Sequence, residues 1–95
     1  MRNSSNRPPI VANLGSAIRR RRLLVGLTLS SLAKKSGLSL GYVSQVELGT
    51  SSPSLYTLTR LCGVLEVTFT QLFSLAEVQE EIARIESAAL SNAGT

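Results

Sequence analysis

Apolar residues recur along the chain at the three- and four-residue spacing of amphipathic helices, and polar or glycine-containing turns separate the periodic stretches. The first stretch contains Leu14, Ala17 and Ile18 and is followed by Gly26, which predicts a helix over about residues 12–25. No stretch combines strict alternation with the β-branched residues of a strand. The pattern therefore predicts an all-α fold.

Turn and capping residues divide the middle of the chain into three more helices. Thr28 and Ser39 are suited to cap helices that end at Gly37 and Gly49. Pro53 is suited to the first position of the next helix. The apolar stripe of that helix consists of Leu55, Leu58, Leu61, Cys62 and Leu65. These four helices would share one core.

The C-terminal part predicts a short fifth helix and then a separate amphipathic helix. Thr68 is the expected cap of the fifth helix, with Leu72 and Phe73 buried. From residue 75 onward, apolar side chains step by three or four and form the seam Leu75, Val78, Ile82, Ile85 and Ala89. Such a seam needs a partner. Pairing with a second copy of the chain is the favoured hypothesis, and packing on the protein's own domain is the alternative.

A length of 95 residues suits one domain, which we expect over residues 12–74. Residues 1–11 are polar and basic and are expected to form a disordered arm, and residues 75–95 form the added C-terminal helix with a frayed end. No apolar run approaches the roughly 18 residues of a membrane span, and the polar start does not resemble a secretion signal. We therefore expect a cytoplasmic protein that does not bind membranes.

Charge is divided unevenly along the chain. Residues 1–60 carry nine Lys or Arg against Glu47 alone, whereas residues 61–95 carry Arg84 against five Glu. This division favours a basic surface that binds a polyanion and an acidic surface kept away from it.

The residue types exclude several kinds of chemistry. The chain has no His, no Asp and a single cysteine, Cys62. It therefore cannot form an internal disulfide, a zinc finger or a histidine-based catalytic centre. Cys62 lies in an apolar stripe and is expected to be a core residue. We predict a protein that is not an enzyme and that has neither a metal site nor a cofactor.

Residues 29–46 have the spacing of two short helices joined at a tight turn. Ala33 is small where two helices would pass closely, and Gly37 lies where the turn needs a positive φ. Leu32, Leu38, Val43 and Val46 would supply the shared core. The joint spacing favours a helix-turn-helix over an unrelated helical hairpin.

Over about residues 14–74 the sequence resembles the phage-repressor and Cro type of helix-turn-helix regulator, also called the xenobiotic response element family. The matching positions are Leu14-Gly15, Ile18-Arg19, Arg22, Gly26-Leu27-Thr28, Leu32-Ala33, Gly37-Leu38-Ser39, Tyr42-Val43-Ser44-Gln45-Val46-Glu47, Gly49, Pro53-Ser54-Leu55 and Leu65. The resemblance implies a five-helix domain that binds double-stranded DNA as a homodimer, with the third helix, about residues 40–47, in the major groove.

The resemblance also implies roles for individual residues. The exposed residues near the start of the recognition helix are the candidates for base contacts: Gln45, Ser44, Leu40 and Gly41. Among them, the Gln45 amide can donate and accept together, as adenine requires. Hydroxyl groups near helix starts and cations beside them are candidates for phosphate contacts: Thr28, Ser39, Tyr42, Thr50, Ser51, Arg19 and Arg7. Arg22 and Glu47 match family positions that form a structural ion pair.

The sequence departs from the family pattern at three positions. Arg21 and Ser36 stand where apolar residues are usual, and Leu29 replaces a Gln that often contacts DNA. None of these changes alters the predicted fold. The alternative function is a protein-interaction module, such as an antitoxin, whose C-terminal helix binds a partner protein.

Overall fold

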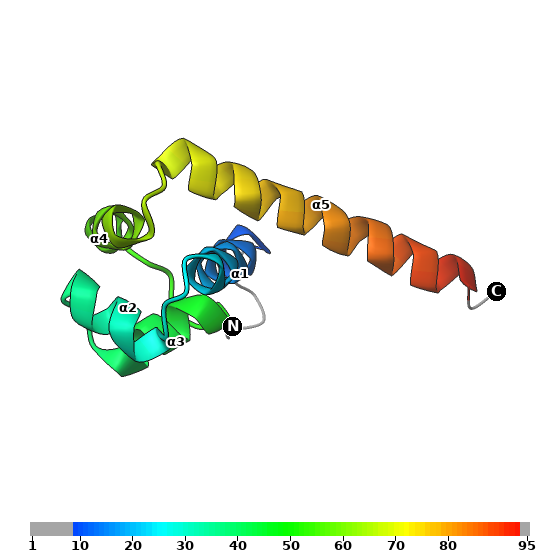
Figure 1. The fold of residues 1–95 in the computed structure, drawn as a ribbon. Coiled ribbons are helices and arrows are strands. Elements are labelled where there is room, and N and C mark those ends of the chain that lie inside the picture. The colour runs from blue at the N-terminus through cyan, green and yellow to red at the C-terminus, as the bar shows by residue number, and fades with distance from the viewer. Residues whose placement is uncertain (1–8, 94–95) are drawn as a thin grey trace.

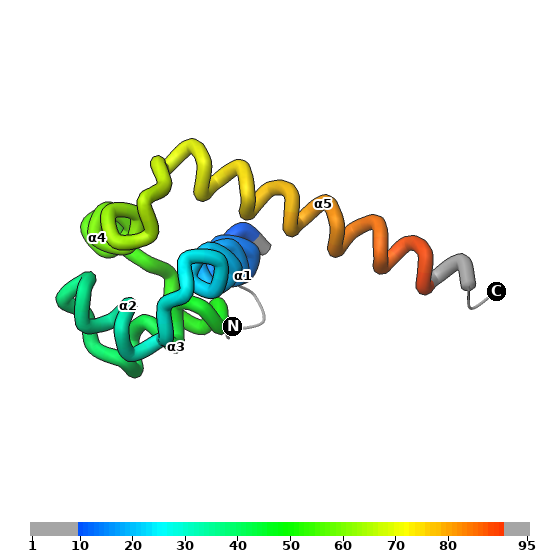
Figure 2. The backbone as a smooth tube through the Cα atoms, in the orientation of Figure 1, coloured from blue at the N-terminus to red at the C-terminus, as the bar shows by residue number. Residues whose placement is uncertain are grey.

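The computed structural model describes residues 9–93, which form five α-helices and no strand. The helices are α1 (Pro9–Leu24), α2 (Leu29–Ser36), α3 (Leu40–Leu48), α4 (Leu55–Leu65) and α5 (Phe69–Ala93). Helices α1 to α4 form a compact group, and α5 packs along α1 before it extends beyond the group (Figures 1 and 2). The predicted all-α fold is confirmed.

The core lies where α1, α2, α3 and α4 meet the first half of α5. Its fully buried large side chains include Ile18, Leu32, Leu61, Leu65 and Leu72. Cys62 is also buried, as predicted, and burial raises the pKa of its thiol. The apolar stripes predicted from the sequence therefore converge on one core.

The predicted caps of α2 and α3 are confirmed. The side-chain oxygens of Thr28 and Ser39 accept hydrogen bonds from the N–H groups of Ser31 and Tyr42, at 3.0 and 3.1 Å. At their C-terminal ends, Gly37 and Gly49 have φ values of 72° and 79°. These left-handed conformations favour glycine, so both helices end where the glycines are.

Two helix starts differ from the prediction. Helix α1 begins at Pro9, so residues 9–11 belong to it and not to the arm; Ile10 packs against the core, which favours this extension. Residues 1–8 of the predicted arm lie outside the described residues. Helix α4 begins at Leu55, after Pro53, because the Ser54 hydroxyl accepts the Thr57 N–H at 3.1 Å and caps the helix there.

The predicted fifth helix and the predicted C-terminal helix are one continuous helix, α5. At its start the Thr68 N–H donates to the Gln71 side chain, while the Gln71 N–H donates to the Thr68 hydroxyl. The chain around residue 74 has no Gly or Pro to end the helix, and Leu72 and Ala76, one turn apart, are both fully buried against the core. Helical structure therefore continues past the expected division.

No single helix in the described part of the chain is both long and apolar enough to cross a membrane. Helix α4 and residues Phe69–Leu90 meet that test only as a pair, across a bend of 95°.

Candidate nucleic-acid interface

Helix α3 presents a small, mostly polar face to solvent. Gly41 and Gln45 are exposed, Leu40 is half exposed, and Ser44 is partly covered, whereas Val43 and Val46 are buried beneath them. Residues three and four positions apart share a face of a helix, so the predicted base-contacting residues form one surface. A Cβ atom added at Gly41 would have open space around it.

Helix α1 supports the opposite side of α3. Gly15 lies against the main chain of Val46 and Glu47, and a Cβ atom at Gly15 would be 2.7 Å from the Glu47 carbonyl oxygen. At the end of α3, a Cβ atom at Gly49 would be 2.8 Å from the Ala12 Cα. The two helices are therefore packed backbone to backbone.

A buried ion pair also joins α1 to α3. Arg22 Nε donates to one Glu47 carboxylate oxygen at 2.8 Å and Arg22 Nη2 donates to the other at 3.0 Å, a bidentate arrangement. Their side chains are only 10% and 5% exposed, and Arg22 Nη1 donates a further bond to the Leu27 carbonyl. The hydrogen bonds from Arg22 to Glu47 raise the pKa of the guanidinium, against the opposing effect of burial. The acidic group of α3 is thus neutralised and turned away from the exposed face.

The turn after α3 folds back onto Gln45. The Thr50 N–H donates to the Gln45 main-chain carbonyl at 3.0 Å, and the Thr50 hydroxyl donates to the same oxygen at 3.2 Å. Ser51 contributes a side-chain contact, because its hydroxyl donates to Gln45 Oε1 at 3.0 Å. The amide predicted to contact a base is therefore already held by the protein.

Hydroxyl groups mark the N-terminal ends of α2 and α3. Thr28 and Ser39 are exposed, and a hydroxyl that accepts an N–H bond can still donate its own proton. The Tyr42 hydroxyl lies 3.2 Å from the Thr57 hydroxyl of α4 and shares a hydrogen bond with it. Tyr42 therefore links α3 to α4.

One exposed cation, Arg19, lies on the side of α1 that meets α3. Arg19 is on the stripe of α1 that includes Ala12, Gly15 and Arg22, all of which contact α3 or its following turn. Arg19 itself is exposed, so it lies at the border between α1 and α3. Arg7 lies outside the described residues.

Two arginines have structural roles that sequence reasoning missed. Arg21 Nε donates to the Leu65 carbonyl at 2.8 Å and thereby satisfies the C-terminal end of α4. Arg60 Nε donates to the Ser36 carbonyl at the end of α2. The presence of Arg21 where the family that the sequence resembles usually has an apolar residue could have indicated that this side chain makes a structural hydrogen bond. The other unusual residue, Ser36, is buried and its hydroxyl donates to the Leu32 carbonyl at 2.6 Å.

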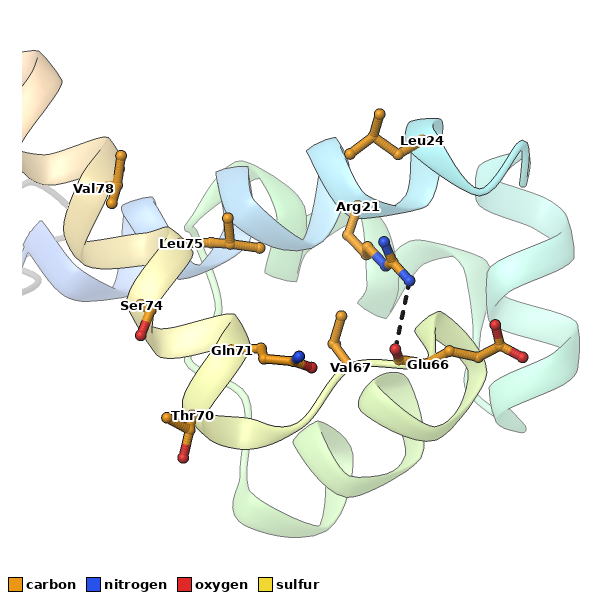
Figure 3. A pocket seen from close by; sticks show the side chains of 9 residues that line it. All are labelled: Arg21, Leu24, Glu66, Val67, Thr70, Gln71, Ser74, Leu75 and Val78. Carbon is orange, nitrogen blue, oxygen red and sulfur yellow. Dashed lines mark hydrogen bonds between the residues drawn. The ribbon is translucent and has the colours of Figure 1, made fainter.

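The predicted C-terminal seam is largely uncovered. Leu75 packs partly against the core, whereas Val78, Ile82 and Ile85 are 54%, 42% and 58% exposed, and Ala89 is exposed as well. An adjoining groove of about 480 Å³ lies between the end of α1 and the start of α5 (Figure 3). Its apolar lining includes Leu24, Val67, Leu75 and Val78. Packing of the whole seam on its own domain is therefore not observed.

Known proteins match both the sequence and this arrangement. The family model described as Helix-turn-helix matches residues 18–72, which is more than half of the chain. The chain belongs to the phage-repressor and Cro-type helix-turn-helix family. Helices α2 and α3 lie within the matched residues.

Individual relatives are transcriptional regulators. The chain is 32% identical over 73 residues to the transcriptional regulator ClgR of Mycobacterium tuberculosis, a match that covers 77% of the chain and 63% of ClgR. The chain thus spans less than two thirds of that relative. The crystal structure of the clp gene regulator ClgR from Corynebacterium glutamicum is 30% identical and has a TM-score of 0.80, with 88% of this chain and 90% of that chain covered. The structure of C.Esp1396I bound to a 25 base pair operator site is 26% identical and has a TM-score of 0.66. The match covers 74% of this chain and 92% of the C.Esp1396I chain.

Proposed function

We propose that this protein is a transcriptional regulator that binds specific sites in double-stranded DNA as a homodimer, and that it is not an enzyme. The observation that carries the proposal is the exposed face of α3, which is small and polar on the outside and firmly supported by α1 on the inside. A helix with such a face can enter the major groove without steric hindrance. The structural neighbour C.Esp1396I, which was solved on its operator, supports DNA as the ligand.

Sequence is read by the exposed residues of α3. Gln45 can donate to N7 and accept from the amino group of adenine, Leu40 can contact a thymine methyl group, and Ser44 can bond to several base edges. Gly41 allows the backbone of α3 to approach the bases closely, since no side chain stands there. Discrimination then depends on the register in which α3 lies in the groove.

Phosphate contacts hold that register. Thr28 and Ser39 lie at the N-terminal ends of α2 and α3, where N–H groups and the helix dipole attract an anion. Arg19 adds a cation at the border of α1 and α3, Arg7 adds one from the N-terminal arm, and the Thr50 hydroxyl lies on the turn after α3. The Tyr42 hydroxyl can accept from Thr57 and still donate its own proton to a phosphate.

Dimerisation uses the uncovered seam of α5. Val78, Ile82 and Ile85 form an exposed apolar stripe along α5, and a second α5 would cover it. Two-fold pairing would give the dimer two copies of α3, one for each half-site. The same surface supports the second candidate, an interaction module whose α5 binds a different protein. A regulator related to these bacterial proteins would act in the cytoplasm, where their DNA is.

Selection of bound duplexes from a randomised DNA library at about physiological salt, followed by sequencing, tests the proposal. Enrichment of a two-fold symmetric site is the expected result, and the half-site spacing would report the geometry of the dimer. Salt-sensitive binding without any enriched sequence would contradict the proposal and favour the interaction module.

A further inference from the structure

Among the exposed residues of α3 in the described part of the chain, Gln45 is the one whose side chain is hydrogen-bonded to another side chain. Its Oε1 accepts a hydrogen bond from the Ser51 hydroxyl at 3.0 Å. The turn that carries Ser51 is itself tied to the same residue, because the Thr50 and Ser51 N–H groups both donate to the Gln45 main-chain carbonyl, at 3.0 and 3.3 Å. Main chain and side chain of Gln45 are thus held from one short segment.

We propose that Ser51 is a positioning residue for base recognition, which acts by holding the Gln45 amide in its reading orientation before DNA arrives. This inference rests on the proposed role of Gln45. A carbonyl oxygen has two lone pairs, so Oε1 can accept from Ser51 and from a base amino group together, while Nε2 still donates to a base acceptor. When Ser51 holds Oε1, the amide presents an acceptor and a donor in a fixed orientation. This arrangement matches adenine, which offers one donor and one acceptor in the major groove.

The physical gain is lower conformational entropy in the free protein. A long amide side chain that is mobile in solution loses rotamer freedom when it docks against a base. The hydrogen bond from Ser51 removes part of that freedom in advance, so less is lost on binding. This gain in affinity applies only to DNA that contains the recognised base, since contacts to phosphates do not depend on the orientation of Gln45.

The first experiment uses the free protein and requires no DNA. The ¹⁵N relaxation of the Gln45 side-chain amide is compared in the native chain, in Ser51→Ala and in the matched control Ser52→Ala, which changes an exposed neighbour on the same turn. We expect an ordered amide in the native chain and the control, and a mobile amide in Ser51→Ala. Equal mobility in all three proteins would overturn the inference while leaving the proposed function intact.

The second experiment measures binding to the selected site and to unrelated duplex DNA. Ser51→Ala should weaken binding to the selected site by roughly three- to tenfold, within the range of a side-chain ordering loss, and leave unrelated DNA unaffected. In a Gln45→Ala background the same substitution should have no effect, and Ser51→Thr, which keeps the hydroxyl, should retain the native preference.

Two results of this second experiment would overturn the inference for different reasons. Equal weakening on both DNAs, undiminished in the Gln45→Ala background, would make Ser51 a direct phosphate contact. A native preference in Gln45→Ala itself would remove Gln45 from base reading, and the recognition part of the proposed function would fail with it.

Discussion

Gly15 in α1 lies directly against the main-chain carbonyl of Val46 in α3, with no room for a side chain between the two helices. A methyl group at Gly15 would overlap this oxygen and would also lie 2.7 Å from the Glu47 carbonyl oxygen. Both neighbours are backbone atoms, so neither can rotate away. The separation of α1 and α3, and with it the placement of the α3 face, depends on this glycine.

Gly15→Ala should therefore destabilise the fold by about 3 kcal/mol, at the upper end of the cost of overpacking. Gly63→Ala is the matched control, because a Cβ atom at that exposed position of α4 meets nothing within 4 Å. The control should stabilise the protein by about 0.5–1 kcal/mol, since alanine is the better helix former. Urea denaturation followed by circular dichroism at one protein concentration measures both. Equal effects of the two substitutions would show that α1 and α3 can move apart.

The Arg22–Glu47 pair should be strongly coupled. Glu47→Met alone leaves a buried guanidinium without its partner and should cost about 3–5 kcal/mol of unfolding free energy. Arg22→Met combined with Glu47→Met removes both charges and should cost less than the sum of the single substitutions. A double-mutant cycle measured by denaturation gives this coupling. Additive losses would mean that the two side chains do not depend on one another for stability.

Charge in the α5 seam should separate the proposed dimer. Ile82→Glu combined with Ile85→Glu places two carboxylates in the apolar surface, and we expect monomers. Ala83→Glu combined with Ser87→Glu is the control, since it adds the same charge to exposed positions on the other side of α5. Light scattering measures the mass of each variant. If the seam variant retains the mass of a dimer, the copies associate through a different surface.

Arg19 should contribute to the salt dependence of DNA binding. Replacing it by Gln removes one cation that we propose faces a phosphate, which should reduce the slope of log affinity against log salt by about 0.9. Arg20→Gln changes the same charge about 100° further round α1, away from α3, and should leave the slope nearly unchanged. Titrations at several salt concentrations compare the two. An equal reduction for both would indicate general attraction without a specific contact.

Ionisation of the Cys62 thiol should lower the unfolding free energy at alkaline pH. Burial raises the pKa of its thiol above the ordinary value of 9.0, so the unfolded chain loses this proton at a lower pH than the folded protein does. The contribution to stability is complete below pH 9.0 and is lost as the pH rises through the folded pKa. The unfolding free energy of the native chain should therefore decrease more steeply above that pH than that of Cys62→Ala. Parallel pH profiles would show that the thiol is not protected by the fold.

Local sequence determined the limits of α3 and which of its residues are exposed. Ser39 and Gly49 specify the limits of α3 through a cap and a left-handed turn, which are properties of a few neighbouring residues. Helical periodicity then separates buried Val43 and Val46 from exposed Gln45 without reference to any other segment. Recognition of the family added the Arg22–Glu47 pair, which spacing alone would not have identified.

Tertiary structure decided the contacts between segments. Arg21 caps α4 from a position 44 residues away, and Arg60 caps α2 from a position 24 residues away, so neither contact has a local pattern. The continuity of α5 depends on where α1 and the core lie, because burial of Ala76 extends the helix past the expected break. Likewise, a sequence can place Gln45 on an exposed face, but only the path of the following turn brings the Ser51 hydroxyl to its amide. Such contacts arise from three-dimensional packing, which a pattern of neighbouring residues does not encode.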